Sequence, residues 1–306
     1  MSKPQHFLQI DDLEPTELEH VLSVARERRD EDYEGDHTPP LQRKTLGMIF
    51  EKPSTRTRVS FETGMTQLGG HAVFLGPNDT QLGRGEPLRD TSRALSGYVD
   101  AVMARVFDHE DIAELARYAS VPVVNGLSDV AHPCQALADL LTIQDHFGGF
   151  EGVRAAWVGD GNNVAHSFAV GAAMMNLELS IATPSGYEPD DAVIDRASAY
   201  GNAPTVTTNP NEAVADADVI YTDVWVSMGE DDERDEKLTA FDGFQVNDDL
   251  LAAAADDAVV MHCLPAHRGE EITDVVMESD RTIVWDQAEN RMHAQNGLLC
   301  YLLDAE

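Results

Sequence analysis

Short apolar runs rich in β-branched residues alternate along this chain with stretches whose apolar residues recur every three to four positions. Phe61, Met65 and Leu68, spaced at i, i+4 and i+7, show the second pattern and predict the buried face of a helix. In the first half of the chain, strands are expected at residues 45–50, 71–76, 101–106 and 121–126. Strands that alternate with amphipathic helices indicate βαβ units and a parallel sheet.

The pattern starts again after the glycine-rich stretch 146–152, which predicts a boundary between two domains. The second series of strands is expected at residues 154–160, 179–184, 204–209, 218–224, 258–265 and 282–286. Helices are expected near 15–30, at 133–146 and at 287–303. The predicted fold class is therefore α/β, with two doubly wound domains whose central, mainly parallel sheets are flanked by helices.

Acidic residues dominate the composition. The 306 residues include 55 Asp and Glu against 21 Lys and Arg, which gives a formal net charge of −34. Residues 43–105 differ, because their nine basic and six acidic residues give a charge of +3. So acidic a chain repels nucleic acids and anionic membranes, and we interpret the basic segment as a site for a small anion. The composition is typical of a cytoplasmic protein of a halophile, whose carboxylates keep its surface hydrated in molar salt.

Three cysteines are present and none forms a CxxC pair. The N-terminal stretch MSKPQHFLQIDD lacks the apolar core of a signal peptide, and no apolar run approaches the roughly 20 residues that cross a bilayer. A reduced, cytoplasmic setting is expected, and membrane insertion is not.

The segment FEKPSTRTRVSFE, residues 50–62, follows the first expected strand and opens a helix inside the basic region. Ser54, Thr55, Arg56 and Thr57 combine hydroxyls, backbone N–H groups and a guanidinium at a helix start, where the helix dipole favours an anion. The pattern predicts a phosphate site. An ordinary Ser/Thr helix cap followed by surface arginines is the alternative.

Two further strand ends carry polar residues that suit a carbonyl group. Arg105 ends the strand expected at 101–106, and His132 and Gln135 open the helix that follows the strand at 121–126. Ligands bind beyond the carboxyl ends of strands in open α/β sheets. A His with an Arg nearby stabilises the oxyanion that forms when a carbonyl is attacked. The alternative is that His132 only caps its helix.

In the second half, the GDGNNV segment lacks the third glycine of GxGxxG, which argues against a nicotinamide cofactor. Asp223, Ser227 and Met228 follow another expected strand and offer a carboxylate to an ammonium group. Cys263 adds a thiol after the next strand, although a lone cysteine is more often a core residue. The His–Cys pairs at 132/134 and 262/263 lack the spacing of structural zinc sites, so no metal is expected.

Seven segments, taken together and in this order, resemble ornithine carbamoyltransferases across nearly the whole chain. They are FEKPSTRTRVSFE, MARV, HPCQALADLLT, GDGNNVAHS, DVWVSMG, HCLP and DQAENRMH. The resemblance implies a carbamoyl phosphate-binding domain at 1–147, an ornithine-binding domain at 148–286, and a C-terminal helix at 287–306 that packs back on the first domain. It also implies that carbamoyl phosphate and ornithine give citrulline and phosphate, or the reverse in arginine breakdown, in a homotrimer or an assembly of trimers with no cofactor.

The matching positions give the site that the resemblance implies. Carbamoyl phosphate is expected to contact Ser54, Thr55, Arg56, Thr57, Gln81, Arg105, His132, Gln135, Cys263, Leu264 and Arg291, with Gln81 supplied by a neighbouring subunit. Ornithine is expected to contact Asn163, Asp223, Ser227 and Met228, with Asn162 as the alternative to Asn163. Arg56, Arg105, His132 and Cys263 are the expected catalytic residues. The segment 227–237 is expected to be a lid whose carboxylates face solvent.

Two alternatives remain open at this point. The first is a carbamoyltransferase that uses another amine, namely aspartate, putrescine or acetylornithine. An aspartate enzyme would need extra cations for the second carboxylate, and residues 151–270 contain only five basic residues. The other alternative is a non-catalytic protein that binds a phosphorylated metabolite without turnover.

Overall fold

In the computed structural model, which describes residues 3–30, 39–77, 85–227 and 231–305, the chain divides into two compact units. The first unit comprises Met1–Leu141 and Asn290–Glu306, and the second comprises Thr142–Glu289. Each unit has its own parallel sheet flanked by helices, so the predicted α/β fold class is confirmed.

The sheet of the first unit has four strands in the order β2-β1-β3-β4. The strands are β1 (Thr45–Phe50), β2 (His71–Leu75), β3 (Ala101–Arg105) and β4 (Val123–Leu127), and every pairing is parallel. All five residues of β3 are buried, as expected for a central strand of a parallel sheet whose two faces are both covered. Phe50 pairs with Arg105, so β1 and β3 end side by side.

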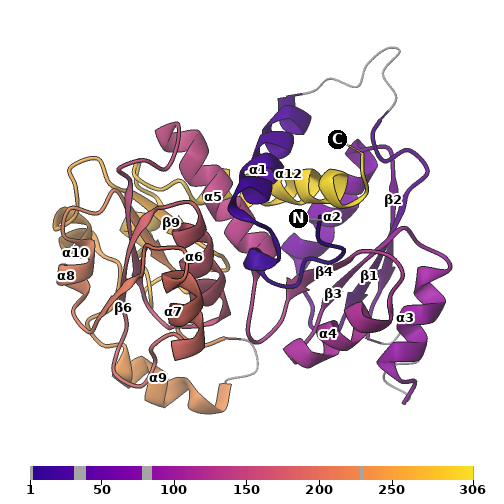
Figure 1. Cartoon of the computed structure of the whole chain (residues 1–306). Coiled ribbons are helices and arrows are strands. Elements are labelled where there is room, and N and C mark those ends of the chain that lie inside the picture. The colour runs from indigo at the N-terminus through magenta and orange to yellow at the C-terminus, as the bar shows by residue number, and fades with distance from the viewer. Residues whose placement is uncertain (1–2, 31–38, 78–84, 228–230, 306) are drawn as a thin grey trace. The chain divides into compact units, whose positions relative to one another are not determined.

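Five helices and a 3-10 turn accompany this sheet: η1 (Ile10–Asp12), α1 (Pro15–Asp30), α2 (Thr55–Gln67), α3 (Leu88–Ser96), α4 (His109–Tyr118) and α5 (Pro133–Phe147). The last helix, α12 (Val284–Leu302), lies next to α1 in Figure 1. The two helices touch through their backbones, because a Cβ placed on Gly297 would lie 2.6 Å from the carbonyl oxygen of Val21. The Tyr301 hydroxyl also donates to Glu17 Oε1 at 2.7 Å.

The sheet of the second unit has five parallel strands in the order β7-β6-β5-β8-β9. They are β5 (Arg154–Val158), β6 (Glu178–Ala182), β7 (Thr205–Thr207), β8 (Val219–Thr222) and β9 (Val259–His262). The helices are α6 (Asn163–Met174), α7 (Asp191–Ser198), α8 (Pro210–Val214), η3 (Asp231–Glu233), α9 (Arg234–Ala240), α10 (Asp248–Ala252) and α11 (Asp274–Met277). The strand order reverses at β5, so β5 and β8 flank the position where open α/β sheets bind ligands.

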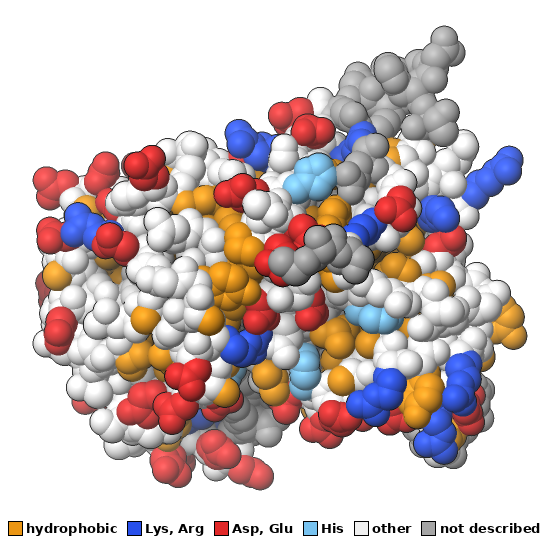
Figure 2. Space-filling model, in the orientation of Figure 1, with side chains coloured by type: hydrophobic (Ala, Val, Ile, Leu, Met, Phe, Trp, Pro, Cys, Tyr) orange, Lys and Arg blue, Asp and Glu red, His pale blue; other side chains and the backbone are white. Residues whose placement is uncertain are grey.

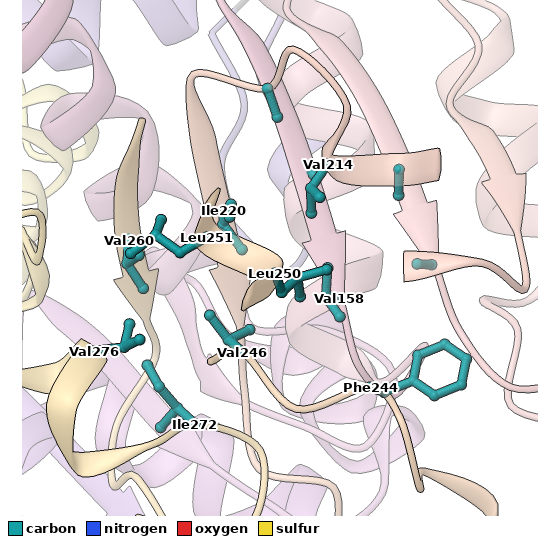
Figure 3. Packing of buried hydrophobic residues seen from close by; sticks show 14 of the residues in the cluster. Val158, Val214, Ile220, Phe244, Val246, Leu250, Leu251, Val260, Ile272 and Val276 are labelled. Atoms are coloured by element: carbon teal, nitrogen blue, oxygen red, sulfur yellow. The ribbon is translucent and has the colours of Figure 1, made fainter. Parts of the chain in front are cut away.

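The core of the second unit lies against β5, β8 and β9. Figure 3 shows Val158, Ile220 and Val260 from these strands packed with Leu250 and Val276 from the covering helices. Burying each such side chain contributes about 1.5–3 kcal/mol. The strands are held rigidly by this packing, and the loops at their carboxyl ends are therefore well positioned.

One expected strand is absent. Residues 282–286 form only a single bridge, between Thr282 and Val260, and α12 begins at Val284. The prediction of a strand was wrong because a short apolar run fits a strand and a buried helix start equally well. Asp286 in the first turn suits the positive end of the helix dipole and favours the helix.

Charge is distributed as the composition suggests. Figure 2 shows Asp and Glu side chains spread over the face in view, with fewer Lys and Arg side chains among them. Within the described residues, none of the helices combines the length and the apolar composition that crossing a membrane requires.

Candidate functional site

The start of α2 in the first unit is capped by its own hydroxyl residues. Ser54 Oγ accepts a hydrogen bond from the Thr57 backbone N–H at 3.3 Å and donates to Thr57 Oγ1 at 3.0 Å. Thr57 is buried, whereas Thr55 and Arg56, in the first turn, are exposed. The exposed part of the helix start therefore combines the Arg56 guanidinium with the positive end of the helix dipole, an arrangement that suits an anion.

Arg291, on α12, connects this helix start to α5. Its Nη1 donates to Gln135 Oε1 at 2.9 Å, and its Nη2 donates to Thr57 Oγ1 at 2.7 Å and to His132 Nε2 at 3.1 Å. Gln135 is fixed in turn, because its Nε2 donates to the buried Asp139 Oδ1 at 2.8 Å. Four of the residues expected at the carbamoyl phosphate site are thus brought together by one guanidinium.

His132 is neutral in this environment. Burial lowers the pKa of His132 well below its ordinary value, and the positive charges of Arg291, Arg105 and Arg56 lower it further. A guanidinium only donates hydrogen bonds, so Nε2 is the accepting nitrogen and the single ring proton lies on Nδ1. The effect of three guanidinium groups on one imidazole also shows that these four side chains lie in one cluster.

The backbone explains how Arg105 reaches this cluster. It is the last residue of β3, pairs with Phe50 at the end of β1, and is 5% exposed. Its carbonyl oxygen accepts from the Glu51 N–H at 2.9 Å, which holds the loop before Ser54 against β3. The strand ends therefore converge as the sequence predicts.

In the second unit, Asp223 follows β8 and is 6% exposed. Burial raises the pKa of Asp223 to about 6, while His262, the Val224 N–H and the Asn162 side chain act in the opposite direction. Glu271 adds a further upward contribution. A buried carboxylate with so few partners of opposite charge is well suited to receive an ammonium group.

Asn162 rather than Asn163 holds Asp223 in place. Asn162 Nδ2 donates to Asp223 Oδ2 at 3.1 Å, and Asn162 Oδ1 accepts from the N–H groups of Val164 and Ala165 at 2.9 and 3.1 Å. It is the N-cap of α6, and Asn163 is the first helical residue. Because both ends of its amide are engaged, Asn162 acts as a support, and Asn163 remains the residue predicted to contact ornithine.

Cys263 and Leu264 follow β9, also in the second unit. Their position is fixed by His262, whose Nδ1 accepts from the Leu264 N–H at 2.8 Å and whose Nε2 lies 2.9 Å from Glu271 Oε1. Since Nδ1 is the accepting nitrogen, Nε2 donates to Glu271. The His262 N–H is in turn bound by Gln287 Oε1 at 2.9 Å. The thiol is therefore carried on a rigid loop.

One group in the described residues has the ligand atoms for a metal ion: His267, Glu270 and Glu271, within 4.8 Å of one another. Both carboxylates already have partners, because Glu270 pairs with Arg234 and Glu271 accepts from His262 and from the His267 N–H. We therefore interpret the group as a hydrogen-bonded loop.

Two predicted site residues, Gln81 and Met228, lie outside the described residues, and Ser227 is half-buried at the end of a described segment. Sequence reasoning missed the supporting residues Asp139 and Glu271. Asp139 stands four positions after Gln135, and this helical spacing was a signal that could have identified it. Nothing local in the sequence indicates that Glu271 reaches His262.

Comparison with known proteins matches both halves of the chain to the same family. Residues 5–145 match the family model for the carbamoyl-P binding domain of aspartate/ornithine carbamoyltransferases, and residues 151–302 match that for the Asp/Orn binding domain. The ornithine carbamoyltransferase of Haloquadratum walsbyi is 61% identical over 99% of both chains. That of Methanoculleus marisnigri is 57% identical over 97% of this chain and 96% of its own.

Solved structures agree with the sequence relatives. The ornithine carbamoyltransferase of Pyrococcus furiosus superposes with a TM-score of 0.94 at 50% identity, covering 99% of this chain and 98% of that one. The Thermus thermophilus enzyme gives a TM-score of 0.90 at 44% identity, covering 99% and 100%. By its two matched domains and its full-length relatives, the chain belongs to the aspartate/ornithine carbamoyltransferase family, in its ornithine carbamoyltransferase branch.

Proposed function

We propose that this protein transfers the carbamoyl group of carbamoyl phosphate to the δ-amine of L-ornithine and releases L-citrulline and phosphate. Family membership supports this reaction class, and the names of the relatives support ornithine as the amine. The observation that carries the proposal furthest is the convergence of Arg56, Arg105 and Arg291 on a neutral His132. Such a cluster suits a small dianion that also bears a carbonyl group.

In the first unit, the start of α2 binds the phosphate group. Ser54, Thr55 and Thr57 provide hydroxyl and backbone donors, and the exposed Arg56 provides the charge. Arg105, His132 and Gln135 surround the carbamoyl group, and Arg291 orders His132 and Gln135. Gln81 of a neighbouring subunit completes the phosphate contacts.

In the second unit, Asp223 binds the α-ammonium group of ornithine, and Asn163, Ser227 and Met228 contact the rest of the amino acid. Cys263 and Leu264, in the loop after β9, are proposed contacts of carbamoyl phosphate. Because residues 151–270 include only Arg154, Arg196, Arg234, Lys237 and Arg268 as basic residues, this unit is poorly suited to a substrate with two carboxylates. This favours ornithine over aspartate.

The reaction is a direct attack on the carbamoyl carbon. The neutral δ-amine forms the new C–N bond with its lone pair, and the carbonyl oxygen gains negative charge near Arg105 and His132. The carbonyl then re-forms as the C–O bond breaks, and the proton lost from nitrogen passes to the departing phosphate, which is held by Arg56. Positioning and electrostatic stabilisation provide the catalysis, so we propose a reaction without a covalent enzyme intermediate and without a cofactor.

We further propose that the protein acts in the cytoplasm of an organism that accumulates salt, as a homotrimer or an assembly of trimers. The net charge of −34 supports the first point, because carboxylates bind water strongly when salt screens their repulsion. The expected contribution of a neighbouring subunit through Gln81 supports the second.

The deciding experiment is a citrulline assay in molar KCl. Carbamoyl phosphate is offered with L-ornithine, L-aspartate, putrescine or N-acetylornithine, and product is measured for each amine. Turnover with ornithine at least about a hundredfold above the other amines is the expected result. Turnover with a different amine would redirect the assignment, and phosphate binding without any turnover would indicate a binding protein.

A further inference from the structure

Lysine is nearly absent from this chain, and the one lysine of residues 142–289 is buried. Lys237, on α9, is 4% exposed. Its Nζ lies 2.8 Å from Asp160 Oδ2, and the side chains of the two residues are 5% and 10% exposed. Lys237 Nζ also lies over the Tyr187 ring, 5.8 Å from its centroid. The acidic chain has few lysines, and this one is not a surface residue.

Asp160 belongs to the turn between β5 and α6. Trp157 Nε1 donates to its carbonyl oxygen at 3.0 Å, which fixes one side of the turn. The next residue, Gly161, donates its N–H to the Tyr187 carbonyl at 2.9 Å, and a Cβ at Gly161 would lie 2.3 Å from Pro189 N. The turn is therefore held between Trp157 and the 187–189 segment.

The turn leads directly to the Asp223 carboxylate. Two positions after Asp160, Asn162 caps α6 and donates to Asp223 Oδ2 at 3.1 Å. On the other side, α9 follows the segment that carries Ser227. Lys237 thus ties together the two segments that contribute the proposed ornithine contacts of this unit.

Energetics also favour a positioning role. A buried ion pair contributes little net stability, because removing two charges from water offsets most of their attraction. Losing one partner has a large effect, since the remaining charge has no water to replace it. A buried pair is also screened far less by salt than a surface pair, so it keeps its geometry in the molar salt that this composition suits.

We propose that Lys237 is a positioning residue for the amine substrate: it holds Asp160, and through the Asp160–Asn162 turn it sets the place of the Asp223 carboxylate. The inference rests on the proposed ornithine site. Without Lys237, the buried Asp160 carboxylate loses the positive charge beside it, the turn shifts, and Asn162 moves with it. Binding of ornithine weakens, whereas binding of carbamoyl phosphate, on the other unit, changes little.

The test compares Lys237→Met, Lys237→Arg and Asp160→Asn with wild type in molar KCl, measuring kcat and the KM of each substrate. Lys237→Met is expected to raise the KM for ornithine about tenfold or more, with less than about a twofold change in the KM for carbamoyl phosphate. Lys237→Arg keeps the positive charge, so its KM for ornithine should lie closer to that of wild type. Asp160→Asn gives an intermediate effect, because an amide oxygen still accepts from Nζ.

Arg154→Met is the matched control. It removes an exposed ion pair, Arg154 with Asp216 at 3.5 Å, from the opposite end of the same strand β5. Its kinetic constants are expected to equal those of wild type. Equal rises in both KM values, or an unchanged KM for ornithine in folded Lys237→Met and Asp160→Asn, would overturn the inference. If the wild-type protein makes no citrulline, the result contradicts the proposed function itself.

Discussion

Arg291 Nη1 donates to Gln135 Oε1 at 2.9 Å, although 156 positions separate the two residues in sequence. Through this bond the last helix of the chain reaches the first turn of α5. The same guanidinium contacts Thr57 and His132, so three segments of the first unit, namely α2, the start of α5 and α12, depend on one side chain. Its removal takes one hydrogen-bond donor from each of three buried acceptors, Gln135 Oε1, Thr57 Oγ1 and His132 Nε2.

Arg291→Gln is therefore expected to lower the free energy of unfolding by about 3 kcal/mol and turnover by at least about a hundredfold. The pKa of His132 should rise, because Arg291 is one of the charges that lower it. An NMR titration of the His132 ring protons measures this shift. Arg29→Gln is the control, since Arg29 Nη1 donates to the neighbouring Asn290 at 3.2 Å without touching His132. An unchanged His132 titration in Arg291→Gln would contradict the arrangement.

Arg56→Gly should abolish most turnover while leaving the fold intact. Arg56 is exposed, so its loss changes stability by little more than the cost of a glycine, about 1 kcal/mol. Turnover should fall by about a thousandfold or more, since the leaving phosphate loses its charged partner. Steady-state citrulline formation and thermal unfolding are the two measurements.

Arg58→Gly makes the same backbone change two residues later. Arg58 pairs with Glu62 at 3.0 Å and stacks 3.8 Å from the Phe74 ring centroid. Its turnover should stay within a few-fold of wild type. Equal activity losses in both variants would indicate damage to α2 rather than loss of an anion contact.

Asp223 should make ornithine binding depend on pH. The pKa of its carboxyl is raised to about 6, so the ionised form that binds an ammonium group is lost as pH falls through about 6. A substrate analogue without the δ-amine, 2-aminopentanoate, separates this effect from protonation of the reacting amine. Its inhibition constant should rise about tenfold per pH unit below about 6. A constant value from pH 7 to pH 5 would exclude Asp223 as the ammonium partner.

The same raised pKa has a cost for stability. In the unfolded chain the Asp223 carboxyl returns to its ordinary value of 3.8, so the folded state binds this proton more tightly. Its contribution to stability is therefore present at low pH and is lost as pH rises from about 4 through about 6. Asp223→Asn is expected to gain up to about 3 kcal/mol at pH 8 and to lose ornithine binding. Urea unfolding at pH 8 measures the gain, and a less stable variant would contradict it.

Gly297→Ala should separate α12 from α1. The added methyl would lie 2.6 Å from Val21 O and 2.7 Å from Ala25 N, and backbone atoms move less readily than side chains. A loss of about 1–3 kcal/mol is expected in urea unfolding. Gly149→Ala is the control, because a Cβ there meets nothing within 4 Å. Equal stability of the two variants would show that the helices tolerate a wider spacing.

Salt should stabilise the protein by screening. The free energy of unfolding in urea is expected to rise with KCl and to level off near 1 M, where the Debye length is already about 3 Å. The reason is the net charge of −34, whose self-repulsion opposes the compact state. A rise that continues linearly to several molar would indicate exclusion of salt from the surface instead, and a fall would contradict the prediction.

Much of the fold follows from local patterns. Phe61, Met65 and Leu68 are 1%, 0% and 1% exposed, so the predicted buried helix face is confirmed. The run at 282–286 was misjudged because β-branched content does not separate a strand from a buried helix start. Boundaries differ by one to three residues elsewhere, as at β4, which begins at Val123 instead of residue 121, and at β9, which ends at His262 instead of residue 265.

Some residues of the site were also predictable from local patterns, and others were not. Helix starts and strand ends indicated Ser54, Arg105 and His132, because parallel strands end at one edge. The bond from Arg291 to Gln135 is different, since no local rule connects residues so far apart, and only the family motif indicated Arg291. Asn162 supports Asp223 because its side chain points from the start of α6 toward the end of β8. The sequence has two adjacent asparagines here and does not show which of them makes this contact.

The contacts of Arg291 constrain the order in which this protein assembles. The first unit is interrupted by the whole of the second, and its cluster of Thr57, His132 and Gln135 needs a side chain made after residue 289. During synthesis, residues 5–145 form their sheet while the cluster still lacks Arg291, and closing it is a late step of high contact order. A separately expressed 5–145 segment is therefore expected to bind phosphate weakly and to expose the face of α1 that Gly297 covers.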